Sequence, residues 1–414
     1  MLMIKFIHAA DLHLDSPFKG LRRIPKELLS TIKQATFDAL TKIVDEAISH
    51  QVDFLLISGD IYDVEDRSIK AQVVLKRELE RLIPHNIHVF IIHGNHDYQT
   101  SQQDHLALPE NTHVFPNTVE TIETTTKTGK RVAITGFSYD KKWIEERKIS
   151  EYPTRHPQVD YHIGLLHGYA EGQQTDHARY APFSINELRQ KQYDYWALGH
   201  IHKFQQLASD PLIYYSGNPQ GRHRKEEGEK GCLLVELNEP NKQVTFLPTA
   251  QVIWTNIEVD LTEKTTLNSI FEAVKEAVSQ DENTFSLITL HLTVSNDLPS
   301  SVIKKLEQLD FYEALQLYSE QSFHYIVESK VSVQAGENEV VSLKKVFPTA
   351  WETAIEEMKK SKAFNIETDE LYNSYVHSKY LNPRDDRYRN EIVERAMNLL
   401  LQDLGDKEGA EYED

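Results

Sequence analysis

Five mostly apolar runs in the first half of the chain each end at a short string of Asp, His or Asn residues. Short runs rich in Ile, Leu, Val and Phe that end in polar turns are typical of buried β-strands. The runs occupy residues 4–7, 54–57, 89–92, 163–166 and 195–198. Because the ends of neighbouring strands meet at one edge of an α/β sheet, we expect the polar strings to lie close together.

The polar residues at these strand ends are suitable ligands for divalent metal ions. They offer carboxylate and amide oxygen and imidazole nitrogen without thiolate, which suits Mn, Fe, Zn or Mg better than a structural zinc site. A single Asp in a turn, or a single His, is more often hydrogen-bonded or solvated than a ligand. Five such strings in one order are poorly explained as independent accidents, so we predict a two-metal site that cleaves phosphoesters.

The order of the strings resembles that of the calcineurin-like metallophosphoesterase superfamily. Residues 10–14 (ADLHL), 58–63 (SGDIYD) and 198–202 (LGHIH) are similar to the bacterial SbcD branch, whose eukaryotic and archaeal relatives are the Mre-type DNA repair nucleases. Residues 8–21 and 216–222 are most similar to the YhaO subgroup of Gram-positive bacteria. The resemblance is specific over about the first 250 residues, and it implies a four-layer α/β/β/α sandwich.

The resemblance also implies a set of metal ligands. Those of the first ion would be Asp11, His13, Asp60 and His202. Those of the second ion would be Asp60, Asn95, His167 and His200. Asp60 would then bridge two divalent ions, Mn²⁺ first, with Fe²⁺, Mg²⁺ or Zn²⁺ as alternatives, and the pair would lower the pKa of a bound water and so supply a hydroxide nucleophile.

Two further residues of the third string are implied to assist the reaction. His96 would face the phosphate, where it would stabilise the transition state or protonate the leaving oxygen. Asp97 would orient His96 by accepting a hydrogen bond from its ring, although capping the turn is an alternative role for this carboxylate. Asp63 stands where relatives of the nuclease branch often carry a histidine, so its role is open and no metal is assigned to it.

Composition limits what surrounds this site. The chain has 414 residues, of which 40% are hydrophobic, enough for two or three domains. Its one cysteine, Cys232, excludes an intrachain disulfide and fits a reducing compartment. The N-terminus becomes polar too early for a signal peptide, and no apolar stretch approaches the roughly 18–20 residues of a membrane span. We therefore expect a soluble cytoplasmic protein.

The net charge of −19 at first argues against a nucleic-acid ligand, because phosphate binding normally needs a basic surface. Bound divalent ions would offset several of the acidic residues, and basic residues follow the first and last strings. The expected DNA contacts are Lys19, Arg22, Arg222, Arg224 and Lys225. Solvated charged loops are the alternative interpretation of such clusters.

The pattern changes after residue 250. Residues 1–250 are predicted to form the metallophosphoesterase domain, and residues 251–335 a small α+β cap similar to that of the nuclease branch. The elements expected in the cap are a strand near 255–260, a helix near 264–280, a strand near 285–294, a helix near 298–308, and strands near 313–319 and 323–333.

Residues 336–414 are predicted to form a helical tail with two apolar stripes, separated by a polar linker or a poorly packed helix pair. The stripes consist of Phe347, Trp351, Ile355 and Met358, and of Ile392, Val393, Met397, Leu400, Leu401 and Leu404. Packing on the chain's own domain is one interpretation. The resemblance implies another, docking of this tail on a Rad50- or SbcC-like ABC ATPase, and it also implies a homodimer through residues 26–48.

Three functions are compatible with the sequence. The first is a Mn-dependent DNA nuclease, with 3′→5′ exonuclease and single-strand endonuclease activity, that acts in DNA repair with the ATPase. The second is a phosphoesterase for small nucleotide or cyclic nucleotide diesters, which the acidic charge favours and the cap and tail disfavour. The third, a non-catalytic scaffold, is disfavoured because a scaffold does not need the complete ligand set.

Overall fold

The computed structural model describes residues 3–19, 21, 26–63, 68–98, 105–172, 180–238, 241–280, 285–318, 323–334, 348–372 and 384–408. The chain divides into two compact units. The first consists of Met1–Asn256, Glu282–Thr289 and Gln321–Val327. The second consists of Ile257–Asp281, Leu290–Glu320 and Glu328–Asp414. The predicted division at residues 250 and 335 stays a prediction.

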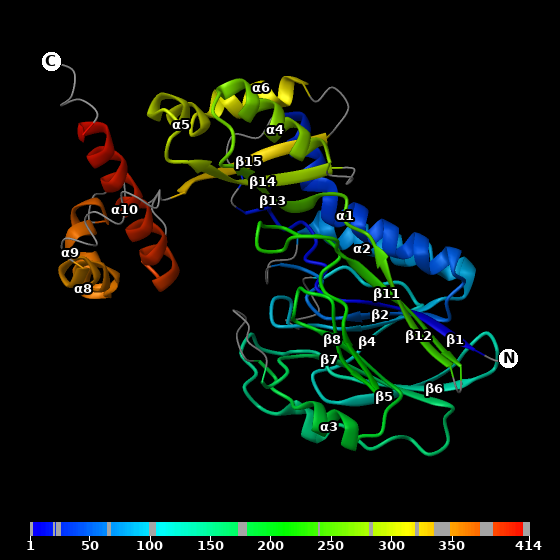
Figure 1. The fold of residues 1–414 in the computed structure, drawn as a ribbon. Helices are drawn as coiled ribbons and strands as arrows, with labels where there is room; N and C mark the ends of the chain where they lie inside the picture. The colour runs from blue at the N-terminus through cyan, green and yellow to red at the C-terminus, as the bar shows by residue number, and fades with distance from the viewer. Residues whose placement is uncertain are drawn as a thin grey trace. The chain divides into compact units, whose positions relative to one another are not determined.

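The first six-stranded sheet contains the strands predicted to carry the first three polar strings (Figure 1). Its order is β12-β11-β1-β2-β3-β4, in which β1 to β4 are parallel and β11 and β12 are antiparallel. The strands are β1 (Ile4–Ala9), β2 (Phe54–Ser58), β3 (His88–Ile92), β4 (Thr112–Val114), β11 (Gly231–Asn238) and β12 (Asn241–Pro248). The carboxyl ends of β1, β2 and β3 therefore meet at one edge.

The second six-stranded sheet has the order β5-β6-β7-β8-β10-β9, with β5 and β9 antiparallel at its two edges. The parallel strands between them are β6 (Arg131–Gly136), β7 (Tyr161–His167), β8 (Tyr195–Gly199) and β10 (Leu212–Tyr215). The edge strands are β5 (Glu120–Thr125) and β9 (Gln205–Ser209). The last two polar strings thus follow neighbouring strands of this sheet.

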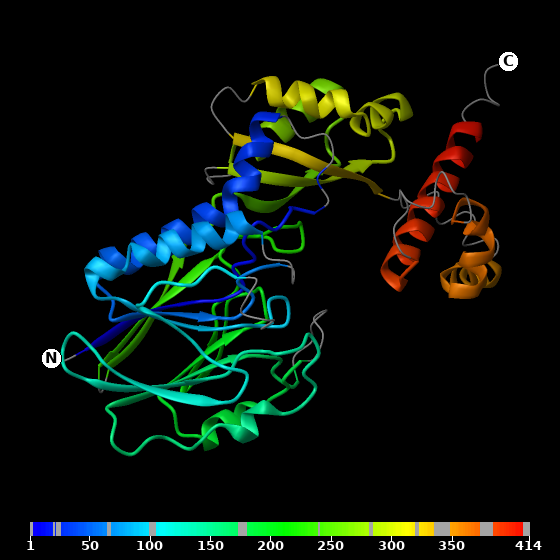
Figure 2. The same ribbon diagram turned by 180° about the vertical axis from the view of Figure 1, so that it is seen from behind.

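The two sheets pack face to face and are covered by helices on their outer sides (Figure 2). Alternate residues of β2 point to opposite faces, as the period of a strand requires: Phe54 and Leu56 belong to the core between the sheets, whereas Leu55 and Ile57 face the helices. The covering helices of the first sheet are α1 (Lys26–Ser49) and α2 (Ile69–Glu80), and α3 (Ile185–Gln190) lies on the second. The predicted α/β/β/α class is confirmed.

A three-stranded sheet follows, with the order β13-β14-β15. Its elements are β13 (Ile253–Leu261), α4 (Leu267–Ser279), β14 (Phe285–Ser295), α5 (Ser300–Leu306), α6 (Leu309–Tyr318) and β15 (Phe323–Gln334). The strand predicted near 313–319 is wrong, because this segment lies largely in α6. Phe311, Tyr312 and Leu315 are buried on one face, a spacing that belongs to a helix rather than a strand.

The described part of the C-terminal region, residues 348–372 and 384–408, is largely helical, as predicted. The helices are α8 (Pro348–Lys359), α9 (Ser361–Tyr372) and α10 (Asp386–Glu408). The segment predicted as a linker or a poorly packed helix pair, residues 361–391, contains α9, in which Phe364 is buried and its ring contacts Tyr388. Of the predicted stripes, Val393 is buried and Met358 is exposed. Phe347 and the side chains of Trp351, Leu400, Leu401 and Leu404 lie outside the description. No described helix is both long and apolar enough to cross a membrane.

Burial of His8 in β1 predicts a pH-dependent stability. Its ring lies 2.9 Å from the Tyr195 hydroxyl through Nδ1 and 3.2 Å from the Leu198 carbonyl through Nε2. Burial lowers the pKa of His8 from 6.5 to about 3, so between these values the unfolded chain binds a proton that the folded chain does not. Stability therefore falls as the pH falls below 6.5, by about 2 kcal/mol at pH 5.

His8→Gln tests this expectation, because an amide can keep both hydrogen bonds and does not titrate. Urea unfolding in EDTA should show that the wild type loses about 2 kcal/mol more than H8Q between pH 7 and pH 5. His85→Gln at an exposed position is the control and should behave as the wild type. Equal pH dependence in the wild type and H8Q would contradict the assignment.

Candidate metal centre

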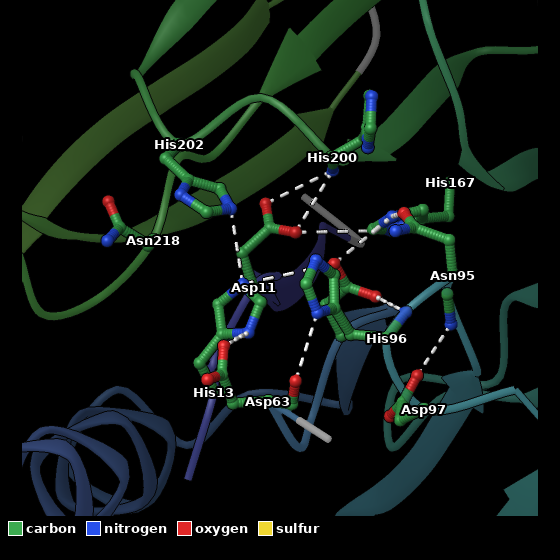
Figure 3. Close-up of polar contacts among 12 residues, drawn as sticks. Asp11, His13, Asp63, Asn95, His96, Asp97, His167, His200, His202 and Asn218 are labelled. Carbon is green, nitrogen blue, oxygen red and sulfur yellow. Dashed lines mark hydrogen bonds and ion pairs between the residues drawn. The ribbon is translucent and has the colours of Figure 1, made fainter. Parts of the chain in front are cut away.

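The predicted ligands come from the ends of five strands that meet where the edges of the two large sheets adjoin (Figure 3). Asp11 and His13 follow β1, Asp60 follows β2, and Asn95 follows β3. From the second sheet, His167 is the last residue of β7, and His200 and His202 follow β8. Strand topology thus gathers residues from across the first half of the chain.

Several of these residues have a backbone conformation that L-amino acids rarely adopt. The φ angle is 53° at Asp11, 44° at His13, 51° at Asp60 and 102° at His200. Backbone hydrogen bonds stabilise these turns, among them Asp11 N to Gly59 O at 3.0 Å and His13 N to Asp60 O at 3.0 Å. Such conformations cost free energy and concentrate at functional sites.

Asp60 occupies the middle of the cluster. Its Oδ1 accepts a hydrogen bond from the backbone N–H of His96 at 3.0 Å. Its Oδ2 lies 3.5 Å from His167 Nε2 and 3.8 Å from His13 Nε2. One carboxylate therefore faces imidazoles from both sheets, as a bridging ligand would.

Hydrogen bonds to Nδ1 leave the Nε2 atoms of two histidines available for a metal. His167 Nδ1 lies 3.0 Å from the Ser58 carbonyl, and His202 Nδ1 lies 2.5 Å from Glu226 Oε1. Each Nδ1 is then the donor, so each Nε2 carries a lone pair. His202 Nε2 lies 3.1 Å from His13 Nε2, and His167 Nε2 lies 3.1 Å from the Asn95 side-chain oxygen. Acceptors that face one another at this distance are typical of a metal site.

Three groups of side chains bring their ligand atoms within 4.8 Å of one another. They are Asp11 with His13 and His202, Asp11 with Asp60 and His167, and His13 with Asp63 and His96. The first two groups contain five of the seven predicted ligands, and Asn95 adjoins the second through His167. This donor set fits two divalent cations, although the assignment of each ligand stays a proposal.

His200 differs from the other predicted ligands. Its backbone N–H donates to the Asp11 carboxylate at 3.0 and 3.2 Å, while its imidazole points away from the cluster (Figure 3). The ring lies 5.3 Å from the His167 ring and 5.7 Å from that of Tyr180, measured between centroids. Its predicted role as a ligand stays a prediction.

The partner of His96 is not the expected one. His96 Nδ1 donates to the backbone carbonyl of Asp63 at 3.0 Å. The Asp97 carboxylate instead accepts hydrogen bonds from the N–H groups of Gly94 at 2.7 Å and Ile61 at 2.8 Å, and lies 3.1 Å from His93 Nδ1. Asp97 therefore stabilises the turn, its alternative role, and the prediction that it orients the His96 ring is corrected.

The pKa values of Asp11 and Asp60, the two central carboxylates, are shifted in opposite directions. Burial and the neighbouring Asp60 carboxylate raise the pKa of Asp11 well above its usual value. Burial would also raise the pKa of Asp60, but His167, His13 and His96 hold it below the usual value. Two buried carboxylates that repel each other are favourable only with positive charge between them, which a divalent cation supplies.

Glycines allow the backbone to approach these side chains closely. A Cβ at Gly94 would lie 2.3 Å from Asp60 Oδ1 and 2.8 Å from His167 Nε2. A Cβ at Gly199 would lie 1.9 Å from the Ser58 carbonyl. The glycines of these two strings are therefore required by the packing of the centre itself.

Arg222 corrects a sequence prediction. Its side chain is buried, and its Nη1 donates to Ser16 Oγ at 3.0 Å and to Asp63 Oδ1 at 2.5 Å. A guanidinium that is buried and paired inside the protein is not available to a DNA backbone. The predicted DNA contact of Arg222 is therefore wrong.

The other predicted DNA contacts differ in their placement. Lys19, Arg224 and Lys225 are exposed, so their predicted contacts stay predictions. Arg22 lies outside the described residues.

Glu226 is a participant that the sequence did not identify, and Asp63 is one whose role the sequence left open. Burial would raise the pKa of Glu226, but the hydrogen bond from His202 and the charge of Arg222 hold it well below its usual value. Asp63 behaves similarly, because its bond to His13 and the charge of Arg222 lower its pKa despite burial. Both side chains are therefore anions that face the imidazoles of two predicted metal ligands, His202 and His13. No local pattern in the sequence distinguishes Glu226 from a surface acid.

Comparison with known proteins gives a consistent result. The family model of calcineurin-like phosphoesterases matches residues 4–204. The chain is 38% identical over 317 residues to the uncharacterized metallophosphoesterase YhaO of Bacillus subtilis, covering 76% of this chain and 77% of that protein.

Two archaeal proteins called DNA double-strand break repair protein Mre11 are more distant. The protein of Sulfolobus acidocaldarius is 22% identical over 343 residues, covering 76% of this chain and 82% of that protein. The protein of Sulfurisphaera tokodaii is 26% identical over 334 residues, covering 75% and 79%. The strand-end motifs, the four layers and these matches agree, and the chain belongs to the calcineurin-like metallophosphoesterases, a family of metal-dependent phosphoesterases.

Proposed function

We propose that this metallophosphoesterase is a DNA nuclease, with 3′→5′ exonuclease and single-strand endonuclease activity, that acts in DNA repair. The observation that carries the proposal is the length of the similarity to the Mre11 proteins. Those alignments cover about three-quarters of the chain and so extend well past residue 204, where the match to the metallophosphoesterase model ends. Similarity confined to the hydrolase domain would support only the general reaction.

The donor set supports two divalent cations, for which we propose Mn²⁺, with Fe²⁺, Mg²⁺ or Zn²⁺ as alternatives. The first ion would be held by Asp11, His13, Asp60 and His202. The second ion would be held by Asp60, Asn95, His167 and His200. When bound, such a pair supplies an activated water and neutralises charge on the phosphoryl oxygens.

His96 is the residue of the centre that we propose to act directly on the phosphodiester. Its Nδ1 is held by the Asp63 carbonyl and its backbone N–H by Asp60. The ring is thereby fixed with Nε2 available to the substrate, and it is partly accessible to solvent. Protonated at Nε2, it can donate to the leaving oxygen as the P–O bond breaks.

The described surfaces also bear on the proposed partners. We propose that residues 336–414 supply a helical docking surface for a Rad50- or SbcC-like ABC ATPase, and Ile366 on α9 is exposed to solvent at 61%. Ile69 and Val73 on α2 are 74% and 49% exposed. The homodimer contact that we propose from the sequence is residues 26–48, where Leu29 on α1 is exposed.

One observation favours a second function, hydrolysis of small nucleotide or cyclic nucleotide phosphodiesters. The chain carries a net charge of −19, whereas DNA-binding surfaces are normally basic. A small diester needs only the centre itself and no extended basic surface.

A substrate comparison separates these functions. The purified chain, loaded with Mn²⁺, is incubated with end-labelled duplex DNA, with single-stranded DNA and with bis-p-nitrophenyl phosphate at matched concentrations. We expect cleavage of both DNA substrates, dependent on Mn²⁺ and lost in EDTA. Cleavage of the small diester alone would reject the nuclease, and bound metal without any cleavage would indicate a scaffold.

A further inference from the structure

We propose that Arg222 is a positioning residue that organises the first metal site through two carboxylates. The buried guanidinium contacts Asp63 and Glu226, and each of these acids in turn faces the Nδ1 atom of one metal-binding imidazole. The inference rests on the proposed metal centre but not on the proposed DNA substrate.

Two loops that carry predicted ligands, and the loop that carries Glu226, meet at this arginine. Its Nη1 donates to Ser16 Oγ, on the loop that follows β1, and to Asp63, on the loop that follows β2. Its backbone N–H donates to Glu226 Oε2 at 2.6 Å, and its Nη2 lies 3.8 Å from Glu226 Oε1. Its backbone carbonyl accepts from Lys19 N–H at 3.0 Å. One side chain thereby connects the loops of Asp11 and His13, of Asp60, and of Glu226.

The carboxylates of Asp63 and Glu226 in turn contact the two imidazoles. Asp63 Oδ1 lies 3.3 Å from His13 Nδ1, and Glu226 Oε1 lies 2.5 Å from His202 Nδ1. The hydrogen bond from His202 Nδ1 to Glu226 fixes the tautomer that leaves Nε2 free and makes that nitrogen a stronger ligand. The Asp63 carboxylate acts on the His13 ring by its charge, at an ion-pair distance. The Nε2 atoms of these two rings then face each other at 3.1 Å, where the first ion would bind.

Charge explains why an arginine is needed between the two acids. Without a cation, Asp63 and Glu226 would be two largely buried anions beside one another, next to Asp11 and Asp60. The planar guanidinium can contact several acceptors at once, whereas a lysine ammonium is a single point charge on a flexible stem. We therefore expect Lys to replace Arg222 only partially.

Among the described residues, the hydrogen bonds and ion pairs of this network reach the two imidazoles proposed for the first ion. His167, which would bind the second ion, is fixed by the Ser58 carbonyl and adjoins Asn95, and neither contact involves Arg222, Asp63 or Glu226. Loss of Arg222 should therefore weaken one of the two metal-binding steps and spare the other. A residue with a general structural role would affect both steps.

Calorimetric titration of Mn²⁺ into the metal-free full chain tests this inference. We expect Arg222→Met to weaken one binding step about 10- to 100-fold, the usual effect of losing the hydrogen-bond partners of a ligand. The other step should change less than about threefold, and R222K should recover part of the loss. Metal analysis after desalting gives a second readout, with two ions expected in the wild type and one in R222M.

Arg155→Met is the matched control. Arg155 is also a partly buried arginine that bonds a carboxylate, Asp194, and backbone carbonyls, but none of these partners belongs to the centre. R155M should be less stable than the wild type in EDTA and bind both ions normally. Equal weakening of both steps in R222M, or no change in either step, would overturn the inference. If the wild type bound both ions but did not cleave DNA, the proposed nuclease function would be rejected and the inference about Arg222 would be unaffected.

Discussion

His96→Ala should slow the cleavage of DNA by about 10²- to 10⁴-fold, the usual contribution of a general acid, while both metal ions stay bound. His96 contributes to the centre through its backbone N–H, which bonds Asp60 and survives the substitution. Its imidazole is anchored at Nδ1 by a backbone carbonyl, so its removal leaves the predicted ligand set intact. The loss should therefore appear in the rate of hydrolysis rather than in Mn²⁺ affinity.

A second substrate shows which role the imidazole has. Bis-p-nitrophenyl phosphate has a leaving group that needs no proton, so H96A should affect its hydrolysis less than that of DNA if His96 is a general acid. Equal losses on both substrates would indicate stabilisation of phosphoryl charge instead. His85→Ala, at an exposed position, is the control. DNA cleavage by H96A at the wild-type rate would contradict any direct role of His96.

The strands and the residues at their ends could be predicted because the relevant signals are local. A run such as 54–57 is apolar throughout, since β2 is buried on both faces, and the Asp that follows has no packing reason to be there. The order of five such strings resembles that of one family closely enough to predict a set of ligands. The strand predicted at residues 313–319 is wrong for a local reason too. The spacing of its apolar residues fits the period of a strand as well as that of a helix.

The partners of the ligands could not be predicted, because they depend on burial and on contacts between distant segments. Arg222 and Asp63 are 159 positions apart, and only the fold brings the arginine from a loop after β10 to the loop after β2. In the sequence, Arg222 to Lys225 is one basic cluster, yet Arg222 is buried and the next two cations are exposed. Similarly, the residues 94–97 do not indicate by themselves that the Asp97 carboxylate bonds the N–H groups of Gly94 and Ile61 and not the His96 ring.

Asp60→Asn should abolish the stabilisation that Mn²⁺ gives to the protein. It should also reduce the rate of hydrolysis by more than about 10- to 100-fold, the usual effect of losing a hydrogen-bond partner of a ligand. Asp60 Oδ2 lies between His13 and His167, so a neutral amide here weakens the sites of both ions. The wild type should gain about 2.7 kcal/mol of stability for each ion bound at a Mn²⁺ concentration about 100-fold above its Kd. Unfolding with and without Mn²⁺ measures this gain.

The metal-free D60N protein should be as stable as the metal-free wild type, or more so. The amide can keep the hydrogen bond from His96 N–H, and its neutrality removes the repulsion that raises the pKa of Asp11. Asp53→Asn is the matched control at the other end of β2, where Asp53 accepts from the N–H groups of Lys5 and Lys127. D53N should lose stability in EDTA and keep the full gain from Mn²⁺. If D60N kept that gain, Asp60 would not be the residue shared by the two ions.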